Sequence, residues 1–216
     1  MNDPISRHPA ALSADSAAFS VPAAVPVRMP VPVPAAVPVP VPVAVRAAVP
    51  DDAELLALLA AETFPLACPP HTLPAAIADF ITTQLSVASF TDYLRDPQRA
   101  LFLAFIGGQP AGYTMVVFEE PTDPDVAAAV TRRPTAELSK CYVRARQHGA
   151  GVAPALIAAS VDSARARGKA SIWLGVNEEN QRANRFYEKQ GFVRVGTKKF
   201  LVGERYEDDF VRELQL

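Results

Sequence analysis

Two stretches in the second half of the chain decide the fold: residues 137–157 read ELSKCYVRARQHGAGVAPALI, and residues 173–192 read WLGVNEENQRANRFYEKQGF. In the first, a strand pattern leads into Gly149-Ala150-Gly151 and a helical pattern follows at once. Glycine lets the backbone approach a phosphate without a Cβ, and the free N–H groups of a helix N-terminus attract anions. Pro154 has no N–H, so it fits only in the first helical turn. The stretch therefore predicts a phosphate-binding turn.

This turn differs from two common phosphate-binding motifs. No Lys-Ser/Thr pair follows the glycines, as it does in GxxxxGK[ST], and Pro154 stands where GxGxxG needs its third glycine. A glycine-rich helix start that binds no ligand is the alternative that the turn alone leaves open. The second stretch adds a strand, an Asn-rich turn and an amphipathic helix, which makes a ligand site the better interpretation.

Together the two stretches resemble the Gcn5-related N-acetyltransferase (GNAT) family, which transfers acetyl from acetyl-CoA to amines. The family's coenzyme loop, Q/R-x-x-G-x-G/A, aligns without gaps with residues 148–153, with His148 in place of Gln or Arg. Residues 180–192, NQRANRFYEKQGF, resemble the family pattern NxxAxxFYEKxGF. Residues 172–180 and 186–211 resemble the PaiA-type polyamine acetyltransferases of bacteria, which implies spermidine or spermine as the acceptor.

The resemblance also implies roles for individual residues. Tyr187 would protonate the departing thiolate, and Glu137 would accept the proton of the amine during direct attack in a ternary complex. The backbone of Cys141, Tyr142 and Val143 would hold the pantetheine arm and the acyl oxygen of acetyl-CoA. The other coenzyme-binding residues would be His148, Gly149, Ala150, Gly151, Val152, Ala153 and Asn180.

Each of these side chains also has a purely structural interpretation. Tyr187 could pack between helix and sheet, and Glu137 could face solvent. Asn180 could serve as the N-cap of its helix and bind no ligand. Cys141 could be a nucleophile, but no partner His is identifiable, so a small buried apolar role is favoured. Two further groups could bind charged ligands or simply face solvent. Arg144, Arg146 and His148 could meet the 3′-phosphate of coenzyme A, and Glu119, Glu120, Glu178 and Glu179 could attract a polycation.

The charge balance limits the classes of partner. The chain has 21 basic and 23 acidic residues among 216, and this formal net charge of −2 excludes a strong overall attraction to nucleic acid or to anionic membranes. The two cysteines, Cys68 and Cys141, lie far apart, so neither a disulfide framework nor a Cys-rich zinc site is encoded, and we expect no metal. Reduced thiols are typical of a cytoplasmic protein.

Proline decides the organisation of the chain. Nine of the 21 prolines lie between residues 21 and 50, interleaved with Val and Ala. Repeated Pro removes backbone donors and favours the polyproline conformation. We therefore expect a disordered Pro/Val/Ala-rich extension over residues 1–42 and an N-acetyltransferase domain over residues 43–216. A polyproline-binding partner for the extension and a homodimer both stay open.

The expected fold class is α/β of the GNAT type, with a mixed, mostly antiparallel sheet flanked by helices. The sheet would splay into a V between the strands that end at Val143 and Val176, which makes a slot for acetyl-CoA. A helical turn is expected at 126–130. The expected strands are 43–48, 101–106, 111–118, 136–143, 170–176, 192–195, 199–202 and 209–214, and the expected helices are 53–63, 74–85, 89–95, 151–168 and 180–189.

The sequence thus predicts an N-acetyltransferase that acts on the primary amine of a small molecule, with a polyamine favoured. A protein acetyltransferase acting on Lys or on an N-terminal amine is one alternative. A non-catalytic, acyl-CoA-binding regulatory module is another. A closed acidic acceptor pocket would favour a polyamine, whereas a wide, shallow groove would favour a protein. Residues 64–134 carry no readable specificity motif.

Overall fold

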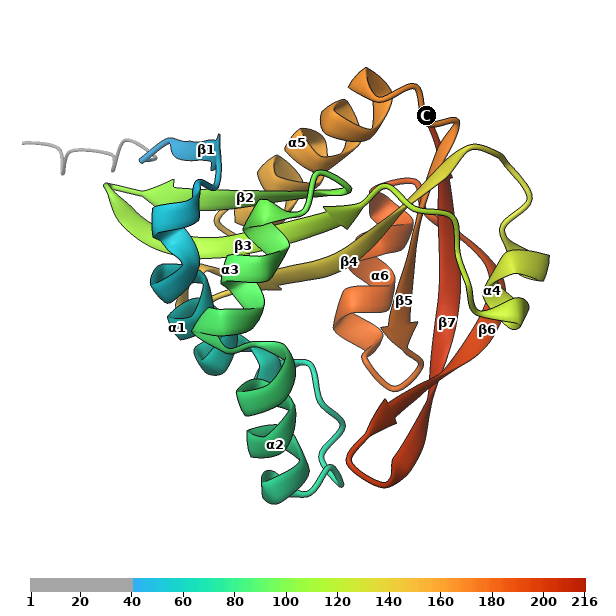
Figure 1. The fold of residues 1–216 in the computed structure, drawn as a ribbon, viewed down its shortest axis with the longest axis horizontal. Coiled ribbons are helices and arrows are strands. Elements are labelled where there is room, and N and C mark those ends of the chain that lie inside the picture. Colours follow the sequence, from blue (N-terminus) through green and yellow to red (C-terminus); the bar gives the residue numbers. More distant parts are fainter. Residues whose placement is uncertain (1–40) are drawn as a thin grey trace, which may run out of the picture. The chain divides into compact units, whose positions relative to one another are not determined.

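The computed structural model describes residues 41–216 (Figure 1). The predicted Pro-rich extension therefore lies outside the described residues, apart from its last two positions. The same holds for the segment that a polyproline-binding partner would recognise. The expected boundary at residue 43 stays a prediction, although the first strand, β1 (Val43–Ala47), begins at that residue. No helix within residues 41–216 is long and apolar enough to cross a membrane.

A seven-stranded sheet organises the described residues, in the order β1-β2-β3-β4-β5-β7-β6. All neighbouring strands are antiparallel except β4 and β5, which are parallel, so the predicted mixed α/β fold is confirmed. The other strands are β2 (Arg99–Ile106), β3 (Gln109–Val117), β4 (Thr135–Val143), β5 (Ser171–Asn177), β6 (Val193–Val202) and β7 (Arg205–Gln215).

Helices cover both faces of the sheet (Figure 1). The helices are α1 (Ala53–Thr63), α2 (Pro74–Gln84), α3 (Val87–Arg95), α4 (Pro124–Ala129), α5 (Val152–Ala166) and α6 (Gln181–Lys189). Strand alternation assigns the faces: Tyr113 and Met115 of β3 pack with α1 and α3, whereas Val116 packs with α5 and α6. The two cores lie on opposite sides of the same strands.

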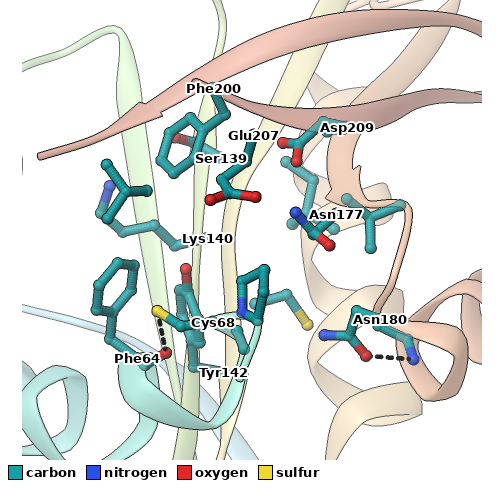
Figure 2. Close-up of a pocket in the computed structure, with 18 of the residues that line it drawn as sticks. Phe64, Cys68, Ser139, Lys140, Tyr142, Asn177, Asn180, Phe200, Glu207 and Asp209 are labelled. Atoms are coloured by element: carbon teal, nitrogen blue, oxygen red, sulfur yellow. Dashed lines mark hydrogen bonds between the residues drawn. The ribbon is translucent and has the colours of Figure 1, made fainter. Parts of the chain in front are cut away.

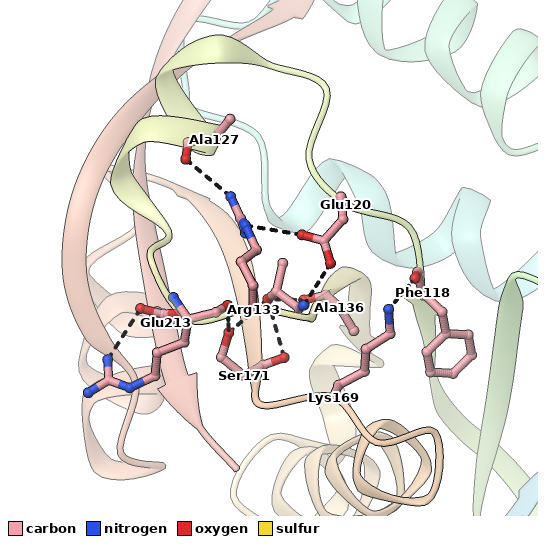
Figure 3. A network of polar contacts seen from close by, with 10 residues as sticks. Phe118, Glu120, Ala127, Arg133, Ala136, Lys169, Ser171 and Glu213 are labelled. Carbon is pink, nitrogen blue, oxygen red and sulfur yellow. Dashed lines mark hydrogen bonds and ion pairs between the residues drawn. The ribbon is translucent and has the colours of Figure 1, made fainter.

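The β4–β5 pair opens into the expected V. The two strands pair only from Thr135 with Ser171 to Glu137 with Trp173, and they diverge beyond those residues. A polar network holds the closed end together (Figure 3). In it, the hydroxyls of Thr135 and Ser171 lie 2.8 Å apart, and Glu120 accepts from the Thr135 amide at 2.9 Å. The far ends of β4 and β5 are thus free to separate.

An extra residue in β4 changes which side chains face the opening. Met115 of β3 faces Lys140 and Val116 faces Leu138, so Ser139 forms a β-bulge. After the bulge, Cys141 joins the core under α5 and α6, and Tyr142 packs on the side of α1. The sequence pattern did not predict this bulge, because it arises from pairing with β3.

The C-terminal strands differ from the prediction. The expected short strands at 192–195 and 199–202 are one continuous strand, β6, which runs antiparallel to β7. Gly196 does not end the strand: a Cβ at this position would lie 2.6 Å from the Cβ of Ala129, so glycine lets α4 pack closely. The β6–β7 hairpin forms one wall of the site described next.

Candidate active site

The glycine turn after β4 offers free backbone donors at the start of α5. Gly149 and Gly151 have φ values of 83° and 82°, a region that favours glycine. Within the described residues, the amides of Gly149, Gly151, Val152 and Ala153 donate to no protein acceptor. Two amides of the predicted residues 148–153 are not free for a ligand. The amides of His148 and Ala150 donate to the carbonyls of Ala145 and Gln147, respectively. Four converging amides still make an anion site.

A cleft of about 360 Å³ begins at this turn and is called the loop cleft here. Its walls come from the end of β4, from the turn itself and from α6, which follows β5 in the chain. The lining residues that the sequence predicted are Cys141, Tyr142, Val143, His148, Gly149, Gly151, Val152, Ala153, Asn180 and Tyr187, and Ala150 is the only predicted coenzyme-binding residue outside the lining.

A second cavity of about 210 Å³, called the acidic pocket here, is lined by β4, β5 and the β6–β7 hairpin (Figure 2). Glu207 and Asp209 reach into it from β7, and Tyr142 and Cys68 form the opposite wall. Its lining also contains the carboxylate residue Glu137, the basic residues Lys140 and Lys198, and the aromatic residues Phe64, Phe80 and Phe200. Of the residues that line this pocket, the sequence had indicated Glu137, Cys141, Tyr142, Asn180 and Tyr187 as site residues.

The loop cleft and the acidic pocket meet at a common set of residues, which we call the junction. Tyr187, Asn180 and the β4 residues Cys141 and Tyr142 line both cavities, together with Ala67 and Ala183. The amide of Arg144 donates to Ala111 of β3, and successive peptide groups of a strand point to opposite sides. We therefore expect the amides of Cys141 and Val143 to face the open V, where they can bind a ligand.

Tyr187 is held at the junction as a neutral phenol. The residue is buried, and its ring packs edge-on against Phe192. Burial raises the pKa of the Tyr187 phenol well above its ordinary value, and the nearby thiol of Cys141 raises it further. The phenol can therefore donate a proton but does not ionise on its own at neutral pH.

The Cys141 thiol is held in its protonated form. Burial raises its pKa to about 11, and a hydrogen bond from Tyr187 offsets this only in part. A thiol of this kind is a weak nucleophile, because the thiolate is the reactive form. This favours the apolar role for Cys141 over an acyl-enzyme intermediate.

Asn180 caps α6, as its sequence position suggested. Its side-chain oxygen accepts from the Ala183 amide at 3.0 Å (Figure 2), and its own amide donates to Asn177. The side-chain NH₂ group of Asn180 remains available to a ligand at the junction, so capping and ligand binding are compatible.

Glu137 lies in the acidic pocket rather than in solvent. Burial raises the pKa of its carboxyl group, while Lys198, Lys140 and Arg99 oppose that shift. Lys140 shows the reverse behaviour: burial lowers its pKa to about 8, and Glu137 opposes the change. The charges of Glu137 and Lys140 thus act on each other, and each favours the charged form of the other.

The four acidic residues that the sequence singled out for a polycation lie elsewhere. None of Glu119, Glu120, Glu178 and Glu179 lines the loop cleft or the acidic pocket. Glu120 instead binds Arg133 at 3.1 Å in the network at the closed end of the V. The pocket acids Glu207 and Asp209 were missed, although their spacing of two residues in a strand places both on one face.

Two of the three basic residues near the turn are engaged with protein groups. Arg144 binds Glu62 at 2.8 Å and the carbonyl of Pro110 at 2.7 Å. The ring of His148 lies 3.0 Å from the Val143 carbonyl and also contacts Arg182, which lines the loop cleft. Arg182 is therefore a cation in the cleft that the sequence analysis did not name. Within residues 41–216, no group of three or more His, Cys, Asp or Glu side chains could hold a metal ion.

Known proteins share this sequence pattern and fold. The profile of the Acetyltransferase (GNAT) family matches residues 61–192. An uncharacterized N-acetyltransferase of Mycobacterium tuberculosis is 42% identical over 165 residues, which cover 76% of this chain and 98% of the relative.

Two solved structures show the likeness of the fold. The PaiA N-acetyltransferase of Thermoplasma acidophilum, in complex with coenzyme A, superposes with a TM-score of 0.65 at 17% identity, covering 81% of this chain and 99% of that one. Mutant forms of the spermidine/spermine N-acetyltransferase SpeG of Vibrio cholerae superpose with a TM-score of 0.55 at 18% identity, covering 80% and 93%.

Proposed function

The chain belongs to the GNAT family of acetyl-CoA-dependent N-acetyltransferases, and from that premise we propose that it acetylates the primary amine of a small molecule. The amine attacks the thioester directly while both substrates are bound. Acetyl-CoA binds in the loop cleft, through the free amides of the glycine turn, the backbone of residues 141–143 and the side chain of Asn180. The amine binds in the acidic pocket.

The observation that carries this proposal is the junction of the two cavities at Cys141, Tyr142 and Tyr187. A coenzyme whose diphosphate binds the turn would extend its thioester along the loop cleft to this point. An amine in the acidic pocket would reach the same point, because the junction residues also line that pocket. Holding both reactants at one place removes much of the entropic cost of their encounter.

The chemistry needs groups that move protons. An alkyl ammonium with a pKa of about 10.4 must lose a proton before attack, which costs roughly 4 kcal/mol near pH 7.4. Glu137 is the proton acceptor that the family resemblance implies, and this role stays a prediction. Tyr187 would give its phenolic proton to the departing thiolate, which its raised pKa supports because the phenol stays protonated until then.

The charge and size of the acidic pocket support a small cationic amine, with a polyamine favoured. Three carboxylates (Glu137, Glu207 and Asp209) outnumber two ammonium groups (Lys140 and Lys198), so the pocket attracts cations. SpeG, which shares the fold, is named as a spermidine/spermine acetyltransferase. A cavity of about 210 Å³ suits a small molecule better than a protein segment.

An amine panel tests the proposal. The purified chain is incubated with acetyl-CoA and with spermidine, spermine, monoamines, amino acids or a Lys peptide, while free thiol and product masses are followed. We expect turnover with a small amine and a product that carries one acetyl group. Turnover with the peptide alone would favour a protein acetyltransferase. Coenzyme binding without turnover on any amine would leave the regulatory acyl-CoA-binding module in its place.

Three further expectations stay predictions of the sequence. A cytoplasmic location is supported by the free thiols of Cys68 and Cys141. The homodimer and the polyproline-binding partner are open to measurement by the mass of the particle in solution and by capture on polyproline-binding domains.

A further inference from the structure

Asp209 differs from Glu207, the other carboxylate that β7 brings to the acidic pocket, because no protein group pairs with it. The residue is only 7% exposed, and it lines the pocket. Within residues 41–216, its carboxylate takes part in no hydrogen bond or ion pair, whereas Glu207 binds His71 at 3.0 Å. The neighbouring Asp208 is exposed and binds Lys199. A buried carboxylate that faces a cavity without a partner can bind a ligand.

The fold directs the carboxylate of Asp209 toward the opening of the V. Asp209 pairs with Asn177 of β5 and with Lys198 of β6. A Cβ on Gly175 would lie 3.2 Å from Asp209 Oδ2, so the missing side chain at Gly175 makes room for this carboxylate. Gly175 follows the last β4–β5 pair by two residues, where the strands have begun to diverge. Figure 2 shows Asp209 beside Asn177, across the pocket from Tyr142.

The charges around Asp209 leave it ionised near neutral pH but able to take a proton. Burial raises its pKa to about 6; Lys198 on β6 opposes the shift, and Glu207 and Asp208 on β7 add to it. The Tyr142 phenol on β4 also faces this charge, and Tyr142 belongs to the junction. Asp209 therefore shares the pocket with the junction, where the proposed function places the thioester.

Glu137 is less suited to the same step. Three cations, Lys198, Lys140 and Arg99, oppose the rise in its pKa, whereas at Asp209 only Lys198 opposes the rise and Glu207 and Asp208 add to it. A proton taken up by Glu137 would remove the negative charge that these three cations favour, so its protonation is opposed more strongly than that of Asp209. The surrounding charges thus favour the ionised form of Glu137 more than that of Asp209.

We propose that Asp209 binds the ammonium group of the acceptor and receives its proton. This assignment rests on the proposed function and names a residue for its first step. One N–H bond of the ammonium breaks and its proton moves to Asp209, from which it passes to solvent. The amine nitrogen then attacks the carbonyl carbon and the C–S bond breaks. The departing thiolate takes the phenolic proton of Tyr187, and the second proton of the nitrogen restores the phenol. The products are an amide, free CoA thiol and one proton.

The test compares D209N, the neighbouring control D208N and the rival E137Q in the full chain. kcat/KM is measured from about pH 5 to 10 with amines of high and low basicity, such as an alkylamine and its trifluoro analogue. For the alkylamine near neutral pH, we expect D209N to lower kcat/KM by roughly 100-fold. In the wild type, kcat/KM should fall as the pH drops through about 6, and we call this fall the acidic limb. The acidic limb should disappear in D209N and persist in D208N and E137Q. The loss of kcat/KM in D209N should be smaller for the weakly basic amine, because that amine is already neutral at this pH and needs no base to deprotonate it before attack.

Binding of acetyl-CoA controls for folding, because Asp209 does not line the loop cleft. D209N should bind the coenzyme as the wild type does, and D209E should regain part of the activity. The proposal is overturned if D209N keeps the limb, if its deficit is equal for strong and weak bases, or if E137Q alone removes the limb. Absence of turnover by the wild-type chain on every amine would overturn the proposed function, and this assignment with it.

Discussion

Tyr187 is the residue whose side chain touches both cavities and whose chemistry fits the leaving group. Replacing Tyr187 with Phe keeps the ring that packs against Phe192 and removes only the hydroxyl. We expect kcat to fall by about 10- to 100-fold, because the thiolate loses its proton donor, while the Kd of acetyl-CoA changes little.

Steady-state kinetics and calorimetric coenzyme binding check this expectation. Tyr206→Phe is the matched control, since Tyr206 is exposed on β7 and lines neither cavity. An unchanged kcat in Tyr187→Phe would remove the phenol from the mechanism.

The burial of Asp209 affects the stability of the folded state as well as the rate of the reaction. Its carboxyl pKa rises from 3.8 to about 6 on folding, so the folded state holds the proton more tightly than the unfolded state does. Stability is therefore lost as the pH rises from about 4 to about 6, and the loss, on the order of 3 kcal/mol, persists above pH 6.

A neutral amide in place of the Asp209 carboxylate would be free of that loss. We expect Asp209→Asn to raise the Tm by several degrees at pH 7.5, and we expect the difference to vanish near pH 4. Thermal unfolding monitored by circular dichroism, with Asp208→Asn as the exposed control, measures it. A lower Tm at pH 7.5, or a difference that does not depend on pH, would contradict the burial of an ionised carboxylate at this position.

Which site residues the sequence could predict follows from where they lie in the chain. The turn at Gly149–Gly151, Asn180 and Tyr187 stand in two continuous stretches with a recognisable spacing. Lys198, Glu207 and Asp209 come from a separate hairpin, and they reach the pocket only because β7 pairs with β5. No local pattern encodes that pairing, so the sequence could not predict that these three residues line the acceptor pocket.

At the scale of elements, the start of α5 is the part of the fold most directly tied to coenzyme binding. Gly151 has a φ of 82° and donates its amide to no protein acceptor within the described residues. Gly151→Ala strains the backbone by about 1–2 kcal/mol and displaces the amides that follow it. We expect the Kd of acetyl-CoA to rise at least tenfold, as measured by calorimetry.

Gly168→Ala supplies the matched control at the other end of the same helix. Gly168 also has a positive φ, 67°, and a Cβ there would meet nothing within 4 Å. Its substitution should cost similar stability and leave coenzyme affinity intact. Equal losses of affinity in the two variants would mean that helix stability, and not the turn, controls binding.

Element boundaries followed local signals closely where such signals exist. The helix predicted at 53–63 is α1, and the strands predicted at 101–106 and 111–118 correspond to β2 and β3, which meet at Gly107 and Gly108, both with positive φ. The extra residue at Ser139 and the continuity of β6 through Gly196 were not predicted. Both depend on neighbours in space, the strand β3 in one case and the helix α4 in the other.

At the scale of the whole described unit, one topological feature creates both cavities. β4 and β5 are the only parallel neighbours in the described sheet, and they pair over three residues before separating. The loop cleft and the acidic pocket both border β4, and Tyr187 lies where they meet. The fold class followed from the motifs, whereas the shape of the acceptor pocket required the packing of distant elements.

A crystal structure of the full chain with acetyl-CoA tests this arrangement most directly. The account predicts diphosphate oxygens within hydrogen-bond distance of the Gly149, Gly151 and Val152 amides, and the thioester sulfur beside the Tyr187 hydroxyl in the opening between β4 and β5. A coenzyme bound outside that opening, or a thioester directed away from Tyr187, would contradict it.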